Sequence, residues 1–372
     1  MSSDTINPCG YNITAPCDDN SHGTHTMGTM VGDDGAGNQI GVAPGAKWIA
    51  CRNMERGNGA PSTYIECFEF FLAPTDINGE NADPTKAPHV INNSWYCSEG
   101  EGCNPSNFEF MHTAVTNLKA AGVVVVVSNG NFGGPCNTSN NPPAFFAESF
   151  SVGATTSIDS IASFSSRGPV TIDGSNRTKP DISAPGQDVR SSIPNGGYAN
   201  YSGTSMAGPH VAGVVGLMVS ANPAIAGEVE TIENIIKTTA IPRTSGDLCG
   251  TVEGWNIPNN TYGHGRINAF EAVKSALLYT PNKEINTYRE GEIDIFPNPF
   301  YNYLDIDLKG NDWNGVAYFK LYDASGKEIM FDKWNTELSK SVRINIPAGL
   351  NSGMYYYQIV AEHSRACGKL IK

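Results

Sequence analysis

The 372-residue chain has few charged residues, and the balance among them is acidic. Asp, Glu, Lys and Arg make up only 16% of the residues, and the formal net charge is −13. Nucleic acid is therefore not expected as a partner, because phosphate binding needs clustered Lys and Arg. No apolar run approaches the roughly 18 residues of a membrane span, and the valine run at residues 123–127 is far too short. With 40% hydrophobic residues, 40 Gly and 23 Pro, the composition is that of a compact, loop-rich globular protein.

The N-terminus shows no leader segment, and the cysteines show no CxxC pattern. Met1 is followed by SSDTINP, which has neither a basic nor an apolar stretch, so a leader was either removed or lies upstream of this sequence. Nine cysteines are many for a cytosolic protein, which favours disulfides and a secreted protein over free thiols. Loop-stapling pairs are expected at Cys9/Cys17, Cys51/Cys67 and Cys97/Cys103. The odd number leaves one thiol, for which Cys367 is the expected residue.

Alternating apolar runs and helical spacings occupy the first 280 residues. The sequence predicts buried strands at residues 47–51, 89–92, 123–128 and 150–154, and helices at 108–121 and 226–239. This alternation predicts an α/β fold in which helices cover a parallel sheet.

The composition changes near residue 279. Polar residues 279–292 are expected to form a linker, and residues 293–372 carry short alternating runs separated by turns. The predicted organisation is an α/β domain at 1–278, this linker, and a small all-β sandwich at 293–372.

The first segment of chemical interest is NSHGTHTMGTM at residues 20–30. Ser21 is expected to cap a helix whose first turn holds His22. His22 and His25 have a spacing that can chelate zinc, but the HExxH glutamate and a third ligand are missing, so no metal site is predicted here. Asp33 and Asp34 follow, where calcium is one interpretation and an exposed acidic turn is the simpler one.

The second segment is YSGTSMAGPHVAG at residues 201–213. Pro209 is tolerated in a first helical turn, which places Ser205 at a helix N-terminus. There its hydroxyl meets free backbone N–H groups and the positive end of the helix dipole, which suit a developing oxyanion. Alone, Ser205 is best interpreted as an N-cap; with the histidine segment it indicates a nucleophile and its base.

Together these segments resemble the His and Ser signatures of the subtilisin-like (subtilase) family. Further stretches follow in that family's order over about residues 17–278: GVAPGA at 41–46, Gly130-Asn131 after the valines, SFSSRG at 163–168, PDISAPG at 180–186 and YGHGRINA at 262–269. The cysteine-bearing insertions between residues 51 and 103 resemble the bacillopeptidase F branch. The resemblance implies a subtilisin-like parallel sheet with helices on both faces.

The resemblance also implies roles for four residues. Ser205 would attack the scissile carbonyl and form an acyl-enzyme, while His22 takes and returns the proton. Asn131 would donate to the oxyanion, and Ser94 lies where the family's backbone pairs with an extended substrate. The residues after Ser94, Trp95-Tyr96-Cys97, depart from the usual small residues and are expected to reshape the primary pocket. Proteins or peptides would be the substrates, with no cofactor in the chemistry.

One part of the family's pattern is missing. The family's orienting Asp precedes the His, ends an apolar strand and is followed by Ser/Thr-Gly. Only Asp4-Thr5 is suggestive here, and Ile6 follows it. We therefore expect the carboxylate and its strand to belong to a longer gene product, and this chain to be weakly active or inactive.

The C-terminal residues resemble the sorting domain of type IX secretion. The resemblance rests on IDIFPNP at 293–299, LYDASGK at 321–327, SGMYYY at 352–357 and GKLIK at 368–372. It implies recognition by the type IX machinery, passage across the outer membrane, and release or attachment at the cell surface. A generic β-sandwich that binds carbohydrate or stabilises the enzyme is the alternative.

Two other functions stay open at this point. An α/β-hydrolase esterase needs Gly-x-Ser-x-Gly and a histidine after the serine, but Ala207 replaces the second glycine. A non-enzymatic remnant or surface-binding protein is the other possibility.

Overall fold

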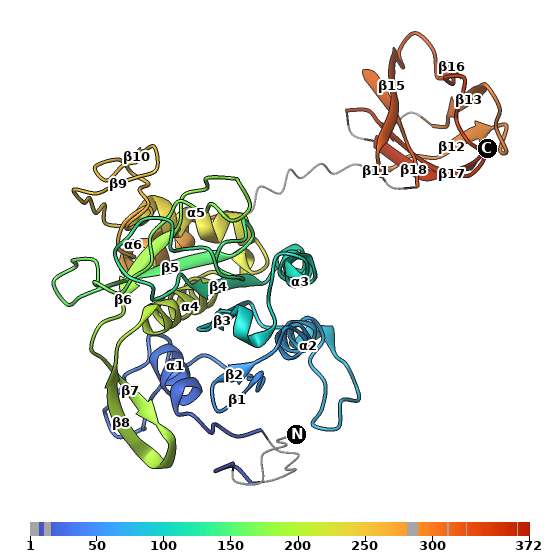
Figure 1. Cartoon of the computed structure of the whole chain (residues 1–372). Helices are drawn as coiled ribbons and strands as arrows, with labels where there is room; N and C mark the ends of the chain where they lie inside the picture. The colour runs from blue at the N-terminus through green and yellow to red at the C-terminus, as the bar shows by residue number, and fades with distance from the viewer. Residues whose placement is uncertain (1–6, 11–15, 281–288, 311, 325, 363) are drawn as a thin grey trace. The chain divides into compact units, whose positions relative to one another are not determined.

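The computed structural model describes residues 7–10, 16–280 and 289–372, apart from 311, 325 and 363. The chain divides into two compact units, Met1–Tyr279 and Thr280–Lys372 (Figure 1). Most of the expected linker, residues 281–288, lies outside the described residues.

Four parallel strands form the central sheet of the first unit, in the order β3-β4-β5-β6. They are β3 (Val90–Asn93), β4 (Val124–Ser128), β5 (Phe150–Thr155) and β6 (Ile182–Pro185). The valine run forms β4, which is buried along its whole length, as a strand covered on both faces must be. The strands predicted near residues 90, 124 and 150 are confirmed to within one residue.

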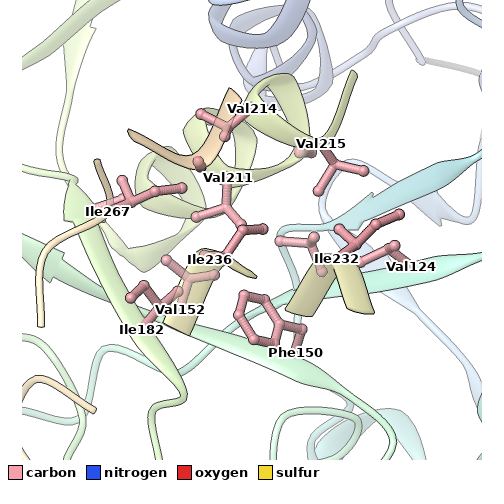
Figure 2. Close-up of a cluster of buried hydrophobic side chains, with 14 of the residues drawn as sticks. Val124, Phe150, Val152, Ile182, Val211, Val214, Val215, Ile232, Ile236 and Ile267 are labelled. Atoms are coloured by element: carbon pink, nitrogen blue, oxygen red, sulfur yellow. The ribbon is translucent and has the colours of Figure 1, made fainter. Parts of the chain in front are cut away.

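Helices cover both faces of this sheet. Successive residues of a strand point to opposite faces, so Val124 and Val126 belong to one core and Val125 and Val127 to another. The first core contains α4 (Thr204–Ala221), α5 (Val229–Thr239) and α6 (Ala269–Leu278). The second contains α2 (Pro61–Leu72) and α3 (Phe108–Ala120). Figure 2 shows the first core, where sheet residues such as Phe150 and Ile182 face Val211 of α4 and Ile236 of α5.

The helix α1 (His22–Val31) packs against α4 and against a hairpin formed by β7 (Val189–Ile193) and β8 (Gly197–Tyr201) (Figure 1). Gly28 makes this approach possible, since a Cβ there would lie 2.1 Å from Ser192 Oγ. The remaining elements of this unit are short: β1 (Met54–Glu55), β2 (Asn58–Gly59), β9 (Leu248–Cys249), β10 (Val252–Glu253), and 3₁₀ turns at Pro84–Lys86, Glu99–Glu101, Pro194–Gly196 and Pro223–Ile225.

The prediction of a strand at residues 47–51 is wrong. These residues have no regular structure, and Trp48 is 60% exposed and Ile49 40% exposed. A strand needs a neighbour for its backbone groups, and no segment of the described chain pairs with this one. β3 is an edge of the sheet for the same reason: β4 is its one partner among the described strands.

Four disulfides staple the first unit. Three are the local pairs expected from the sequence, Cys9–Cys17, Cys51–Cys67 and Cys97–Cys103. The fourth, Cys136–Cys249, joins cysteines 113 residues apart, which local spacing does not reveal. Cys367 is free and exposed, as expected.

The second unit is all-β and built from two sheets. One has the order β11-β18-β17-β14-β15 and the other β12-β13-β16, with antiparallel pairing except between β11 and β18. The strands are β11 (Arg289–Glu290), β12 (Ile293–Phe296), β13 (Tyr303–Leu308), β14 (Val316–Tyr322), β15 (Glu328–Asn335), β16 (Ser341–Asn345), β17 (Met354–Val360) and β18 (Ser364–Ile371). Their inward residues enclose a core that includes Trp313 and Phe319. Among the described helices of the chain, none has both the length and the apolar character to cross a membrane.

Candidate active site

Asp18 caps the helix that carries His22. Its Oδ1 accepts hydrogen bonds from the Asn20 and Ser21 N–H groups at 2.9 and 2.8 Å. Its Oδ2 accepts from the Thr24 N–H at 2.7 Å and the Thr24 hydroxyl at 2.6 Å. The expectation that Ser21 caps this helix is wrong: Ser21 has a left-handed backbone (φ 68°) and its side chain makes no capping bond. A carboxylate at this position also interacts favourably with the helix dipole.

His22 opens α1 and is partly buried. Burial lowers the pKa of its imidazole, the neighbouring His25 lowers it further, and the negative charge of Asp18 opposes both effects. The imidazole is therefore neutral at pH 7, as a general base must be. Among the described residues, no carboxylate accepts a hydrogen bond from the His22 ring, and Asp4 lies outside the described residues.

Asp18 thus has two roles that substitution can separate. Asp18→Asn retains a good capping side chain but removes the charge, so we expect the pKa of His22 to fall while stability changes little. Asp18→Ala removes both, and should lower the pKa and also destabilise the protein by about 1 kcal/mol. NMR titration of the His22 ring and thermal denaturation measure the two effects. An unchanged His22 pKa in both variants would contradict this assignment.

His25, the second histidine of the segment, has a structural role. His25 is buried, stacks on Tyr201 with ring centroids 4.3 Å apart, and places Nε2 3.0 Å from the Val189 carbonyl and 3.1 Å from that of Ala199. Two carbonyl partners require Nε2 to carry a proton, so this nitrogen is not a zinc ligand.

The acidic turn after α1 is closed by its own hydrogen bonds. Asp33 Oδ1 accepts from the Gly35 N–H, and Asp34 Oδ1 accepts from the Ala36 and Asn38 N–H groups. No group of three or more metal-ligating side chains occurs in the described part of the chain. Asp33 and Asp34 are both exposed, so the simpler interpretation, an exposed acidic turn, describes this segment.

Ser205 is the second residue of α4, which begins at Thr204. The expectation that Pro209 lies in the first turn is wrong, because it lies in the second. Pro209 has no N–H to donate to the carbonyl four residues earlier, which is that of Ser205. The Ser94 hydroxyl donates to this carbonyl instead, at 2.7 Å, and the Ser205 hydroxyl is 3.3 Å from the Ser94 carbonyl. Ser94, directly after β3, is thereby bound to the candidate nucleophile in both directions.

This exchange predicts the effect of removing the Ser94 hydroxyl. Ser94→Ala leaves the Ser205 carbonyl without its donor, which should destabilise the protein by about 1–3 kcal/mol. Ser94→Thr keeps the hydroxyl and is the matched control. Thermal denaturation measures both, and equal stability of Ser94→Ala and the native chain would show that the bond is not needed.

Asn131 follows β4 and faces the N-terminus of α4. Its Oδ1 accepts from the Thr204 N–H at 2.8 Å and the Thr204 hydroxyl at 2.9 Å, which directs Nδ2 away from Thr204. A Cβ built on Gly203 would lie 3.4 Å from Asn131 Nδ2 and 3.6 Å from the Ser205 amide nitrogen. The two nitrogen atoms therefore lie close to one point beside Ser205, as the donors of an oxyanion site must.

A disulfide and hydrogen bonds hold the loop that follows Asn131. The Cys136–Cys249 disulfide joins it to the β9–β10 hairpin, and Arg167 binds Asp247 of the segment leading into that hairpin at 2.7 Å. The Thr138 hydroxyl accepts from the Arg167 N–H at 2.9 Å. These bonds limit the movement of the Asn131 loop relative to the sheet.

Aromatic side chains follow both Ser94 and Asn131. Trp95 turns inward and stacks on Tyr64 at 3.9 Å between centroids. Tyr96 and Phe132 are 37% and 46% exposed and meet edge to face at 5.1 Å. This exposed ring pair follows the two residues that flank Ser205, where the sequence led us to expect a reshaped pocket.

The structure brings three of the four expected site residues together: Ser94 is hydrogen-bonded to Ser205, and Asn131 is hydrogen-bonded to Thr204, the residue before Ser205. His22 lies on α1, which packs against the helix of Ser205. Sequence analysis missed Asp18 and Thr204. Their signals were present, as the acidic pair before Asn20 and as the threonine beside Ser205.

A helix-borne serine, a histidine on the adjacent helix and an oriented amide, on a parallel sheet covered on both faces, define the class of subtilisin-like serine peptidases. The chain belongs to the subtilase family, whose family model matches residues 3–265. Residues 294–372 match the secretion system C-terminal sorting domain.

Curated relatives agree with this placement. Bacillopeptidase F of Bacillus subtilis is 42% identical over 268 residues, which are 70% of this chain but only 17% of that protein. Subtilisin BL of Lederbergia lenta is 33% identical over 258 residues, covering 69% of this chain and 79% of its own. Among solved structures, the prenylagaramide maturation protease has the same fold, with a TM-score of 0.53 at 21% identity, covering 70% of this chain and 84% of its own.

Proposed function

We propose that this chain carries the catalytic centre of a secreted serine endopeptidase. Ser205 attacks the scissile carbonyl and forms an acyl-enzyme, and His22 takes the serine proton and delivers it to the leaving amine. Asn131 Nδ2 and the Ser205 N–H stabilise the oxyanion. The convergence of these two donors beside Ser205 is the observation that supports the proposal best. Ser94 presents backbone to an extended peptide substrate.

Among the described residues, His22 has no carboxylate that orients its ring. Asp18 acts on His22 through its charge, but both of its oxygens already accept hydrogen bonds from the first turn of α1. We propose that the carboxylate that orients His22 in other subtilases is missing from this site, so the chain is weakly active as it stands. No cofactor takes part in the proposed chemistry.

The second unit would direct the protein out of the cell. We propose that a domain at residues 293–372 is recognised by the type IX secretion machinery and exported across the outer membrane with the peptidase domain, residues 1–278, joined to it by residues 279–292. In a bacterium with this system, the full chain should be found outside the cell, and a chain ending at residue 292 should stay inside. Export of both would contradict the role of the domain.

Labelling of the nucleophile tests the catalytic assignment. A fluorophosphonate probe should modify the chain at Ser205, as located by mass spectrometry, and Ser205→Ala should abolish the modification. Ser202→Ala, three residues earlier, is the matched control and should label normally. Labelling of another residue would overturn the proposal. So would no labelling at Ser205 when the probe concentration multiplied by the exposure time is about 10⁴-fold above what labels an intact subtilisin.

A further inference from the structure

In the second unit, the outward face of the four strands β15, β14, β17 and β18 is basic and aromatic. In β14, Ala317, Phe319 and Leu321 are buried in the core, so the alternate residues Tyr318 and Lys320 point outward. The same alternation sets the outward residues of the paired strands, because directly paired residues share a face. The resulting rows are Lys333, Tyr318, Val360 and Arg365; then Phe331, Lys320, Gln358 and Cys367; then Glu328, Tyr322, Tyr356 and Lys369.

The charge of this face is opposite to that of the chain. Across β15, β14, β17 and β18 these rows hold four cations, Lys320, Lys333, Arg365 and Lys369, and one carboxylate. That carboxylate, Glu328, binds Lys320 at 3.0 Å. The chain as a whole has a net charge of −13. A cluster of cations on such an acidic protein indicates a surface for a negatively charged partner.

Exposed rings lie among these cations. Phe331 is 49% exposed, Tyr318 42% and Tyr356 39%. The Tyr318 and Phe331 rings are roughly parallel with centroids 5.9 Å apart, and Lys320 Nζ is 5.9 Å from the Phe331 centroid. Neighbouring strands are about 4.8 Å apart, so rings and cations alternate within a few ångströms of one another over the whole face.

We infer that this face binds an acidic polysaccharide. Lys and Arg would bind the carboxylates through charge-assisted hydrogen bonds, and the C–H faces of the sugar rings would contact the exposed aromatic rings, whose faces carry negative charge density. An acidic peptide is a poorer match, because extended peptides bind sheets at an edge through main-chain hydrogen bonds rather than on a face. The inference is independent of the proposed peptidase activity and goes beyond sorting.

A matched pair of polymers tests the charge requirement. The Ser205→Ala chain, which cannot act on itself, should bind polygalacturonate and should not bind its fully methyl-esterified form, which has the same sugars without the charge. Binding should weaken steeply with salt. Equal binding of the two polymers would overturn the inference. Polyglutamate or anionic lipid vesicles binding as tightly as polygalacturonate would overturn it in favour of a protein or a membrane partner.

Variants test the location. The double change Lys333→Gln with Lys369→Gln, and the double change Tyr318→Ser with Phe331→Ser, should each weaken binding at least tenfold. Lys309→Gln removes an exposed lysine near β13 of the other sheet, where Lys309 pairs with Asp294, and should leave affinity unchanged. If all three variants bind equally, the polymer binds elsewhere.

Cys367 offers a readout that needs no substitution. It is the one unpaired cysteine of the nine, and it lies in the row of Lys320 and Gln358. Polygalacturonate should slow its alkylation by iodoacetamide, and the methyl ester should not. An unchanged alkylation rate at saturating polygalacturonate would exclude this face as the binding site.

Discussion

The 372-residue chain is expected to hydrolyse a peptide anilide with a kcat about 10⁴-fold below that of an intact subtilisin. The proposed nucleophile, base and oxyanion donors are Ser205, His22 and Asn131, and no described carboxylate accepts a hydrogen bond from the His22 ring. Without one, the imidazole loses its tautomer preference and the imidazolium loses its stabilisation. The measurement is kcat for this chain and for subtilisin BL on one substrate.

The proposed absence of the orienting carboxylate also changes how much kcat should fall when His22 is removed. In an intact subtilisin, loss of the base costs about 10⁶ in kcat, about as much as loss of the whole triad. With the orienting carboxylate missing, as proposed above, His22→Ala should cost only about a further 10². A fall of 10⁶ would show that the triad is complete.

Asp4 is the discriminating control. It lies outside the described residues, and it is the one acidic residue before His22 whose sequence context suggested the family's pattern. Asp4→Ala should leave kcat unchanged. A fall of about 10⁴ would instead identify Asp4 as the orienting residue and contradict the deficit.

Asn131→Leu is expected to lower kcat about 10²–10³-fold with little change in KM. Leucine is similar in size but has no N–H, so it removes one of the two donors that converge beside Ser205. The effect should be confined to kcat because the oxyanion forms only in the transition state. Steady-state kinetics over a range of substrate concentrations separates the two constants.

Thr204→Val provides the matched comparison for Asn131. It removes the hydroxyl that binds Asn131 Oδ1 but leaves the Thr204 backbone N–H, which binds the same atom. The amide then keeps one of its two anchors, so kcat should fall less than in Asn131→Leu. A larger loss in Thr204→Val, or a change in KM alone for Asn131→Leu, would contradict the oxyanion role.

The sequence was sufficient to predict the features that depend on the local pattern of apolar and polar residues. The valines at 123–127 predicted a strand buried on both faces, and alternation predicted the β-rich second unit. Helix α5 begins at Val229 rather than at residue 226, because a 3₁₀ turn ends at Ile225 and Gly227 takes a left-handed backbone (φ 85°). Such boundary residues depend on single dihedral angles, which hydrophobic spacing does not reveal.

The misses came from interactions between distant residues. The Ser94 hydroxyl satisfies the carbonyl that Pro209 leaves free, although the two residues are more than one hundred positions apart. Asp18 caps the helix in place of Ser21 because a carboxylate four residues before the first helical residue reaches the N–H groups of both Ser21 and Thr24. Residues 47–51 have the apolar composition of a strand, but composition does not supply a partner.

The edge of β3, which has no partner among the described strands on its far side, and the exposed Trp48 and Ile49 affect how the protein must be handled. A strand edge without a partner can pair with another chain. Trp48 and Ile49 add exposed apolar surface, which also favours self-association. Self-association should rise with concentration, and a lysine at Ile49 should suppress it, as light scattering can show. Suppressing this self-association should raise the yield of purified protein.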